Sequence, residues 1–104
     1  MSTSAATSSY VFSYSVVTKT TTYTASISQR VRCDTSGGAF TVTLPDATAY
    51  TGRRISVQKI SSDGNLLTVN TTSSQTINGD LTQAWSAQWD NMEVESNGSN
   101  WEVV

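Results

Sequence analysis

The sequence predicts an all-β protein: a small antiparallel β-sandwich or β-barrel, jelly-roll-like, with about eight short strands and an extended N-terminal arm. Two observations predict this fold. Apolar and polar residues alternate along short runs that are separated by Gly, Asn and Asp, as in half-buried strands joined by turns. Ser and Thr together form about a third of the 104 residues, and they suit the solvent faces of strands better than helices. The length fits one domain with an ordinary core.

The N-terminal part differs in composition from the rest of the chain. Residues 1–22 are expected to form a Ser/Thr-rich arm that includes a possible strand at 10–17, and residues 23–104 to form the β-sandwich module. At period two, aromatic side chains of the arm share one face: Tyr10, Phe12 and Tyr14. Two interpretations stay open. These residues form either the first strand of the module or an added strand on the sheet edge of a neighbour.

Alternating runs then follow nearly to the C-terminus. They occupy residues 23–33, 40–44, 54–60, 66–70, 92–95 and 101–103. Asp63-Gly64 predicts a hairpin turn, and Asn78-Gly79 and Asn97-Gly98 predict two more. The residues of inward parity that we expect to form the core are Leu44, Ile55, Val57, Leu67, Val69, Ile77, Val94 and Trp101.

One internal stretch, TVTLPDATAYTGRRISVQ (41–58), is interpreted as part of the structural scaffold and not as an active site. Pro45 has no N–H for a sheet ladder, so a strand should end at Leu44. Alternation restarts after Gly52, which predicts that a second strand begins there.

Composition excludes several functional classes. A net charge of −2 argues against a nucleic-acid partner, and no apolar run is long enough to span a membrane. The chain has no His, so catalytic triads and His-bearing zinc sites are excluded. A lone Cys33 at core parity predicts a buried thiol. The acidic residues lie next to predicted turns or on solvent-facing strand positions. We interpret them as solvated carboxylates, not as the catalytic carboxylate pair of a glycosidase. We therefore expect no enzyme activity, no cofactor and no metal.

The candidate partner-binding residues fall into two groups besides the arm aromatics. Arg30, Arg32, Arg53 and Arg54 either solubilise strand faces and a turn or pair with acidic groups of a neighbouring subunit. Trp85 and Trp89 lie in a segment without clean alternation. Each is either a lid over the core or an interface residue, and the sequence favours neither.

A series of motifs resembles a family of phage virion modules. The motifs are YTAS (23–26), CDTSGGAFTVTLPDA (33–47), Gly52, ISVQKI (55–60), LLTVN (66–70), TINGD (76–80) and SNGSNWEVV (96–104). Their order covers about Tyr23 to Val104, with Asn78 where the family often has Asp. Such modules occur in tail fibres, head fibres and capsid decoration proteins. The resemblance implies a compact β-module that assembles as a trimer and has no enzymatic activity.

The resemblance gives two functional expectations. The first is a homotrimeric capsid decoration (cement) protein, made in the host cytoplasm, that binds the major capsid protein on the outer capsid surface. Only about twenty residues precede the module, whereas a fibre usually carries a long shaft, and this favours decoration. The alternative is a tail- or head-fibre tip that binds a receptor or carbohydrate.

Overall fold

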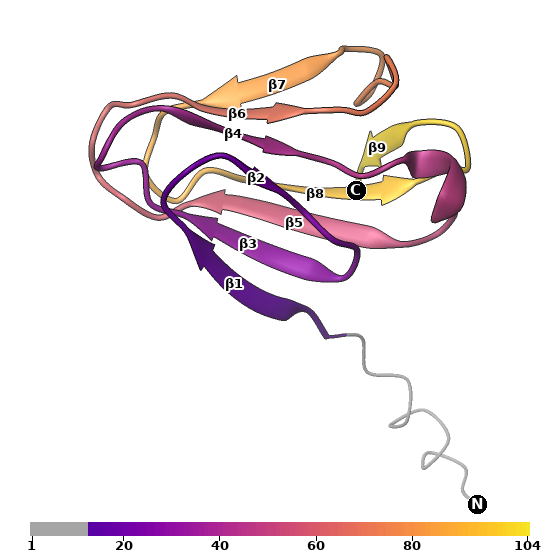
Figure 1. Cartoon of the computed structure of the whole chain (residues 1–104), viewed down its shortest axis with the longest axis horizontal. Coiled ribbons are helices and arrows are strands. Elements are labelled where there is room, and N and C mark those ends of the chain that lie inside the picture. Colours follow the sequence, from indigo (N-terminus) through magenta and orange to yellow (C-terminus); the bar gives the residue numbers. More distant parts are fainter. Residues whose placement is uncertain (1–12) are drawn as a thin grey trace, which may run out of the picture.

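The computed structural model describes residues 13–104, which form two β-sheets packed around one core (Figure 1). The five-stranded sheet has the order β1 (Ser15–Lys19), β3 (Gln29–Cys33), β5 (Arg54–Lys59), β8 (Asn91–Ser96) and β9 (Trp101–Val103). The four-stranded sheet has the order β2 (Tyr23–Thr24), β4 (Phe40–Thr43), β6 (Leu67–Asn70) and β7 (Thr82–Trp85). The expected all-β, sandwich-like fold is confirmed. The only helix within this range, η1 (Ala47–Ala49), is far too short to cross a membrane.

The first six strands alternate between the two sheets. Each step from β1 to β2, from β3 to β4 and from β5 to β6 carries the chain from the five-stranded to the four-stranded sheet. Successive strands within a sheet are therefore parallel, with Val31 beside Val57 and Val42 beside Val69. Strands that return to the same sheet after a crossover are parallel because the chain enters each sheet in the same direction. The result is a short stack of turns of the chain, which we call coils. Each coil is one strand of the five-stranded sheet followed by one strand of the four-stranded sheet.

The sequence predicts an antiparallel, jelly-roll-like arrangement. That prediction is wrong for this stack. The pairs β1–β3, β3–β5, β2–β4 and β4–β6 are all parallel. Asp63-Gly64 shows why the prediction fails. Its sequence is typical of a hairpin turn, but here it lies between β5 and β6, which belong to different sheets.

The C-terminal strands reverse direction and close the stack. β7 pairs antiparallel with β6, β8 with β5, and β9 with β8. Two predicted turns are confirmed there. Asn78 and Gly79 have φ of 49° and 91° between the bridged residues Ile77 and Asp80, and Gly98 has φ of 97° in the loop between β8 and β9.

The predicted core is confirmed. Each of these side chains is fully buried: Leu44, Ile55, Val57, Leu67, Val69, Ile77, Val94 and Trp101. The buried cluster draws on both sheets, and the predicted core thiol Cys33 belongs to it. Burial raises the pKa of Cys33 to about 12, so this thiol stays protonated at neutral pH.

The stretch from Leu44 to Arg54 is a strand exit and re-entry, as predicted. The Asp46 carboxylate accepts from the Thr48 backbone N–H at 2.9 Å and caps η1. Gly52 takes φ of 80° before β5 begins at Arg54. The indole N–H of Trp101 donates to the Pro45 carbonyl at 3.3 Å, which joins this exit to the closing hairpin.

The range 1–22, expected to be an arm, includes β1. This strand pairs with β3 of its own chain, and Val17 packs against the core. Tyr10 and Phe12 lie outside the described residues.

Candidate functional site

The outer face of the five-stranded sheet carries four of the predicted partner-binding residues: Tyr14, Arg30, Arg32 and Arg54. Arg30 and Arg32 lie on β3 at outward parity, alternating with the buried Val31 and Cys33. We call Arg30 and Arg32 the basic strip. Arg30 donates to Gln58 Oε1 at 2.7 Å on the neighbouring β5, so its guanidinium lies along the sheet.

Three glutamates form a second strip on the same face. Glu93 and Glu95 lie on β8 and Glu102 on β9, at the wet parity expected from the sequence. We call them the acidic strip. Glu95 and Glu102 are directly opposite each other across two antiparallel strands, an arrangement that is unfavourable for like charges. On this one face, the cationic groups of the basic strip therefore lie on β3, and the anionic groups of the acidic strip lie on β8 and β9.

Arg54 at the start of β5 lies between the two strips. Its Nε is 3.0 Å from Glu95 Oε2, and its Nη1 is 3.8 Å from Glu93 Oε1. The hydrogen bond to Glu95 raises the pKa of Arg54. These side chains are more than one-third exposed, so the ion pairs contribute little stability but fix the orientation of the guanidinium. Arg53 lies in the preceding turn and donates to Ser28 Oγ at 3.1 Å.

Tyr14 precedes β1 and extends over this face. Its hydroxyl donates to the Glu93 carboxylate on β8. Burial is the main cause that raises the pKa of Tyr14, and this hydrogen bond is the second. Ser56, on β5 between the two strips, is only 2% exposed although it has outward parity. Of the three arm aromatics proposed for partner binding, Tyr14 is thus used by its own sheet.

The two candidate tryptophans have different environments. Trp85 ends β7 and packs against the core, which agrees with a lid over the core. Trp89 is 55% exposed in the loop between β7 and β8, with φ of 72°, a conformation that is strained for a bulky side chain. Its backbone is held there, because Trp89 N donates to the Lys59 carbonyl at 2.8 Å and Gln58 Nε2 lies 3.4 Å from the Trp89 carbonyl.

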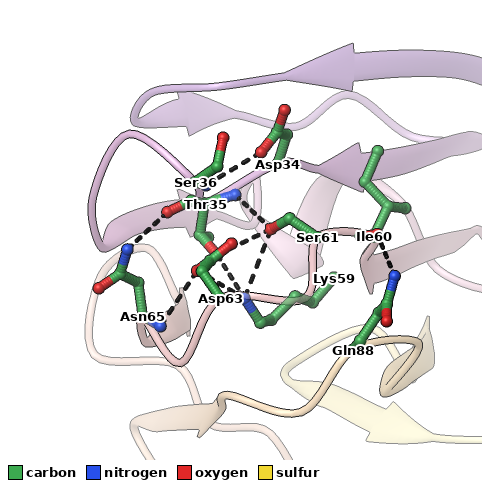
Figure 2. A network of polar contacts seen from close by, with 9 residues as sticks. All are labelled: Asp34, Thr35, Ser36, Lys59, Ile60, Ser61, Asp63, Asn65 and Gln88. Carbon is green, nitrogen blue, oxygen red and sulfur yellow. Dashed lines mark hydrogen bonds and ion pairs between the residues drawn. The ribbon is translucent and has the colours of Figure 1, made fainter.

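A buried ion pair, which the sequence did not predict, lies where the chain leaves β3 and β5 for the four-stranded sheet (Figure 2). Lys59 is fully buried, and its ammonium is 2.9 Å from Asp63 Oδ1. The same ammonium also donates to the hydroxyls of Thr35 and Ser61, so its three hydrogens meet three oxygens. One signal could have found it: Lys59 shares inward parity with Ile55 and Val57 and precedes Asp63 by four residues.

The network also connects loops from separate coils. Thr35 follows β3, whereas Asp63 and Asn65 follow β5 (Figure 2). Asn65 Nδ2 donates to the Thr35 carbonyl at 2.8 Å, and the Thr35 hydroxyl donates to Asp63 Oδ1 at 2.7 Å. Ser61, Thr35 and Lys59 together hold the pKa of Asp63 well below its usual range, so the carboxyl is ionised at neutral pH. The arrangement fastens two crossover loops together.

No metal site or pocket is formed by the part of the chain that the structure describes. Residues 13–104 contain no group of three His, Cys, Asp or Glu side chains placed to hold a metal ion. No pocket is found in that range.

No protein-family model matches the chain, and a search of curated proteins finds no match to it. The resemblance to phage virion modules therefore remains a prediction from sequence motifs.

Proposed function

We propose that this chain is a non-enzymatic structural protein of a phage virion, a homotrimeric decoration protein that binds the major capsid protein on the outer surface of the shell. The observation that carries the proposal is a contact between two of the motifs that resemble phage virion modules. Trp101 of the closing hairpin donates to Pro45 of the LPDA exit at 3.3 Å, across 56 residues of sequence. These two motifs thus contact each other within the fold, and their role is structural.

The scaffold role of these motifs extends beyond that contact. Gln75 Nε2 donates to the Asp46 carboxylate at 2.7 Å, and the Ala47 backbone N–H donates to Gln75 Oε1 at 2.9 Å. Ser96 Oγ donates to the Ala47 carbonyl at 2.6 Å. These bonds hold motif positions to one another within the β-module, and the outward surfaces stay available for partners. We expect a shell-bracing protein to need such cross-links, because any flexibility would be lost on binding at an entropic cost.

The decisive experiment is binding to capsids that lack the protein. The purified chain should bind assembled shells in hundreds of copies per particle, counted by quantitative mass spectrometry of washed particles. Imaging of the decorated particles should show the module on the outer surface. A few copies confined to the tail would contradict the decoration function and support a fibre location.

Trp89 favours the second candidate, a carbohydrate-binding tip. Its indole is exposed, Gln88 and Asn91 are close to it in the sequence, and aromatic faces with hydrogen-bonding amides nearby suit sugars. On this reading Trp89→Ala abolishes binding to host-surface glycans and leaves folding unchanged. Glycan binding by the wild type that survives Trp89→Ala would count against this site.

A further inference from the structure

We propose that the outer face of the five-stranded sheet is an interface with a second copy of this chain, in which the basic strip of one copy lies against the acidic strip of the other. The rotation axis that relates the copies runs parallel to the strands. This inference rests on the self-association included in the proposed function, and it adds the surface, the register and the direction of the axis.

The argument begins with one row of residues across the sheet. Strand register places Val16 beside Arg30, Arg30 beside Ser56, and Ser56 beside Glu93. The Val104 backbone N–H donates to the Glu93 carbonyl at 2.9 Å and completes the row. Read across β1, β3, β5, β8 and the end of β9, the row is apolar, cationic, small and polar, anionic, apolar.

This order is complementary to itself under a particular rotation. A twofold axis parallel to the strands and passing over β5 brings β3 of one copy over β8 of the other, and β1 over β9. It keeps each residue at its level along the strands. Arg30 then faces Glu93, and Val16 faces Val104, while an axis perpendicular to the strands would place Arg30 over Arg30. Only the strand-parallel axis matches the charges.

A threefold axis parallel to the strands satisfies the same rule. Each copy then turns its basic side to the acidic side of the next, and the rows stay level. The valines at the two ends of the row support contact in both cases. Val16 is 58% exposed and Val104 is 53% exposed, so both present apolar surface that a neighbouring copy would cover.

The groups that would meet are already oriented. Arg30 is held by Gln58 at 2.7 Å and lies 3.4 Å from Ser56 Oγ. Glu93 accepts from Tyr14 and lies 3.8 Å from Arg54 Nη1 of its own chain. Both partners of Arg30 are uncharged, so its charge is not neutralised by them. Fixed side chains lose less entropy when a second copy binds. Copies should therefore associate through this face, and salt should weaken the association.

The experiment exchanges the two charges of the central row. Arg30→Glu and Glu93→Arg should each lower the association constant by about tenfold or more, measured by sedimentation equilibrium of the full chain. Arg30→Glu/Glu93→Arg should restore association, because the pair is re-formed with its signs reversed. With a twofold axis, an equimolar mixture of the two single variants should also associate, because each variant then faces its opposite. In a ring of three copies, one contact always joins two identical variants, so the mixture should associate less well than the double variant. Thr82→Glu/Ala84→Glu places the same change of net charge as Arg30→Glu on exposed positions of β7 in the other sheet and should leave association unchanged.

Several results would overturn the interface. These are a monomeric wild type, an Arg30→Glu variant that associates as the wild type does, or a folded double variant that fails to regain association. Circular dichroism of every variant verifies folding. A monomer that still binds capsids would refute this interface and leave the capsid function standing. A dimer through this face would support the interface and contradict the proposed homotrimer.

Discussion

The ammonium of Lys59 and the carboxylate of Asp63 form an ion pair at 2.9 Å in which the lysine side chain is fully buried and that of the aspartate is about one-fifth exposed. A buried ammonium is costly unless all its hydrogens are bonded, and here Thr35 and Ser61 complete the set. The pair lies between loops that follow β3 and β5, so it links two successive coils of the stack.

The difference in exposure predicts an asymmetric response to mutation. Lys59→Met keeps the aliphatic volume and leaves a carboxylate that still accepts from Thr35 and the Asn65 N–H, so it should cost about 1–3 kcal/mol. Asp63→Ala strands a buried charge and should destabilise more than Lys59→Met does. Urea unfolding measures both variants. Equal losses, or a larger loss for Lys59→Met, would contradict this account of the pair.

Acid should unfold the protein through its bonded carboxylates. Hydrogen bonds from Ser36, Gln75 and Ser61 are the leading causes that lower the pKa values of Asp34, Asp46 and Asp63 from the usual 3.8. A depressed pKa contributes stability that is fully present above the unfolded-state pKa and is lost as pH falls toward the folded-state pKa. The melting temperature should thus be level between about pH 5 and 7 and fall below about pH 4.

A carboxylate-to-amide variant checks the source of this acid sensitivity. Asp46→Asn keeps an oxygen acceptor for Thr48 but cannot be protonated, so its melting temperature should fall less steeply below pH 4 than that of the wild type. Parallel acid profiles for the two proteins would show that Asp46 does not contribute. The readout is the difference between the two curves, which does not depend on their absolute stabilities.

The buried and exposed leucines give a matched test of the core. Leu44 is fully buried and Leu81 is 57% exposed. Leu44→Ala should cost about 2–5 kcal/mol because it removes packed methyl groups and leaves a cavity, whereas Leu81→Ala should change stability by less than about 0.5 kcal/mol. Chemical denaturation gives both values. Similar losses at the two positions would mean that inward parity is wrongly assigned.

The same core shows which features the sequence could predict. Alternation identifies the inward faces because side chains on a strand point to opposite sides regardless of which strand lies beside it. Pairing is not encoded in that alternation. Residues 23–33 keep one parity through Val31 and Cys33, yet the chain leaves β2 and enters β3 in the other sheet, turning at Ser28 with φ of 61°.

The candidate surface was predicted only in part, for a related reason. Outward parity identified Arg30, Arg32 and the glutamates individually. The two strips form one face because β5 pairs with β3 on one side and with β8, over thirty residues later, on the other. Such a long-range neighbour cannot be read from local spacing. Lys59 was missed because a charged residue at inward parity is usually an edge or end position, and its oxygen partners come from two separate loops.

The last prediction concerns the segment before β1 as the element that attaches to capsids. Its basis is the composition of residues 2–9, which are Ser, Thr and Ala, followed by the aromatic residues Tyr10 and Phe12 at period two. A segment of this composition can add a strand to the sheet edge of another protein, where main-chain hydrogen bonds supply the affinity. Fixing the backbone of a strand costs about 1–2 kcal/mol of entropy per residue, which contacts with the shell must offset.

The structure defines where a deletion can separate attachment from folding. β1 begins at Ser15, and Tyr14 bonds to Glu93, so removal of residues 2–12 leaves these contacts in place. That variant should keep the wild-type melting temperature and lose binding to emptied capsids. Removal of residues 2–16 also takes away Tyr14 and the first two residues of β1, so it should lower the melting temperature as well. If the shorter deletion binds capsids as tightly as the full chain, attachment lies in the module and the outward surfaces of its sheets become the place to search.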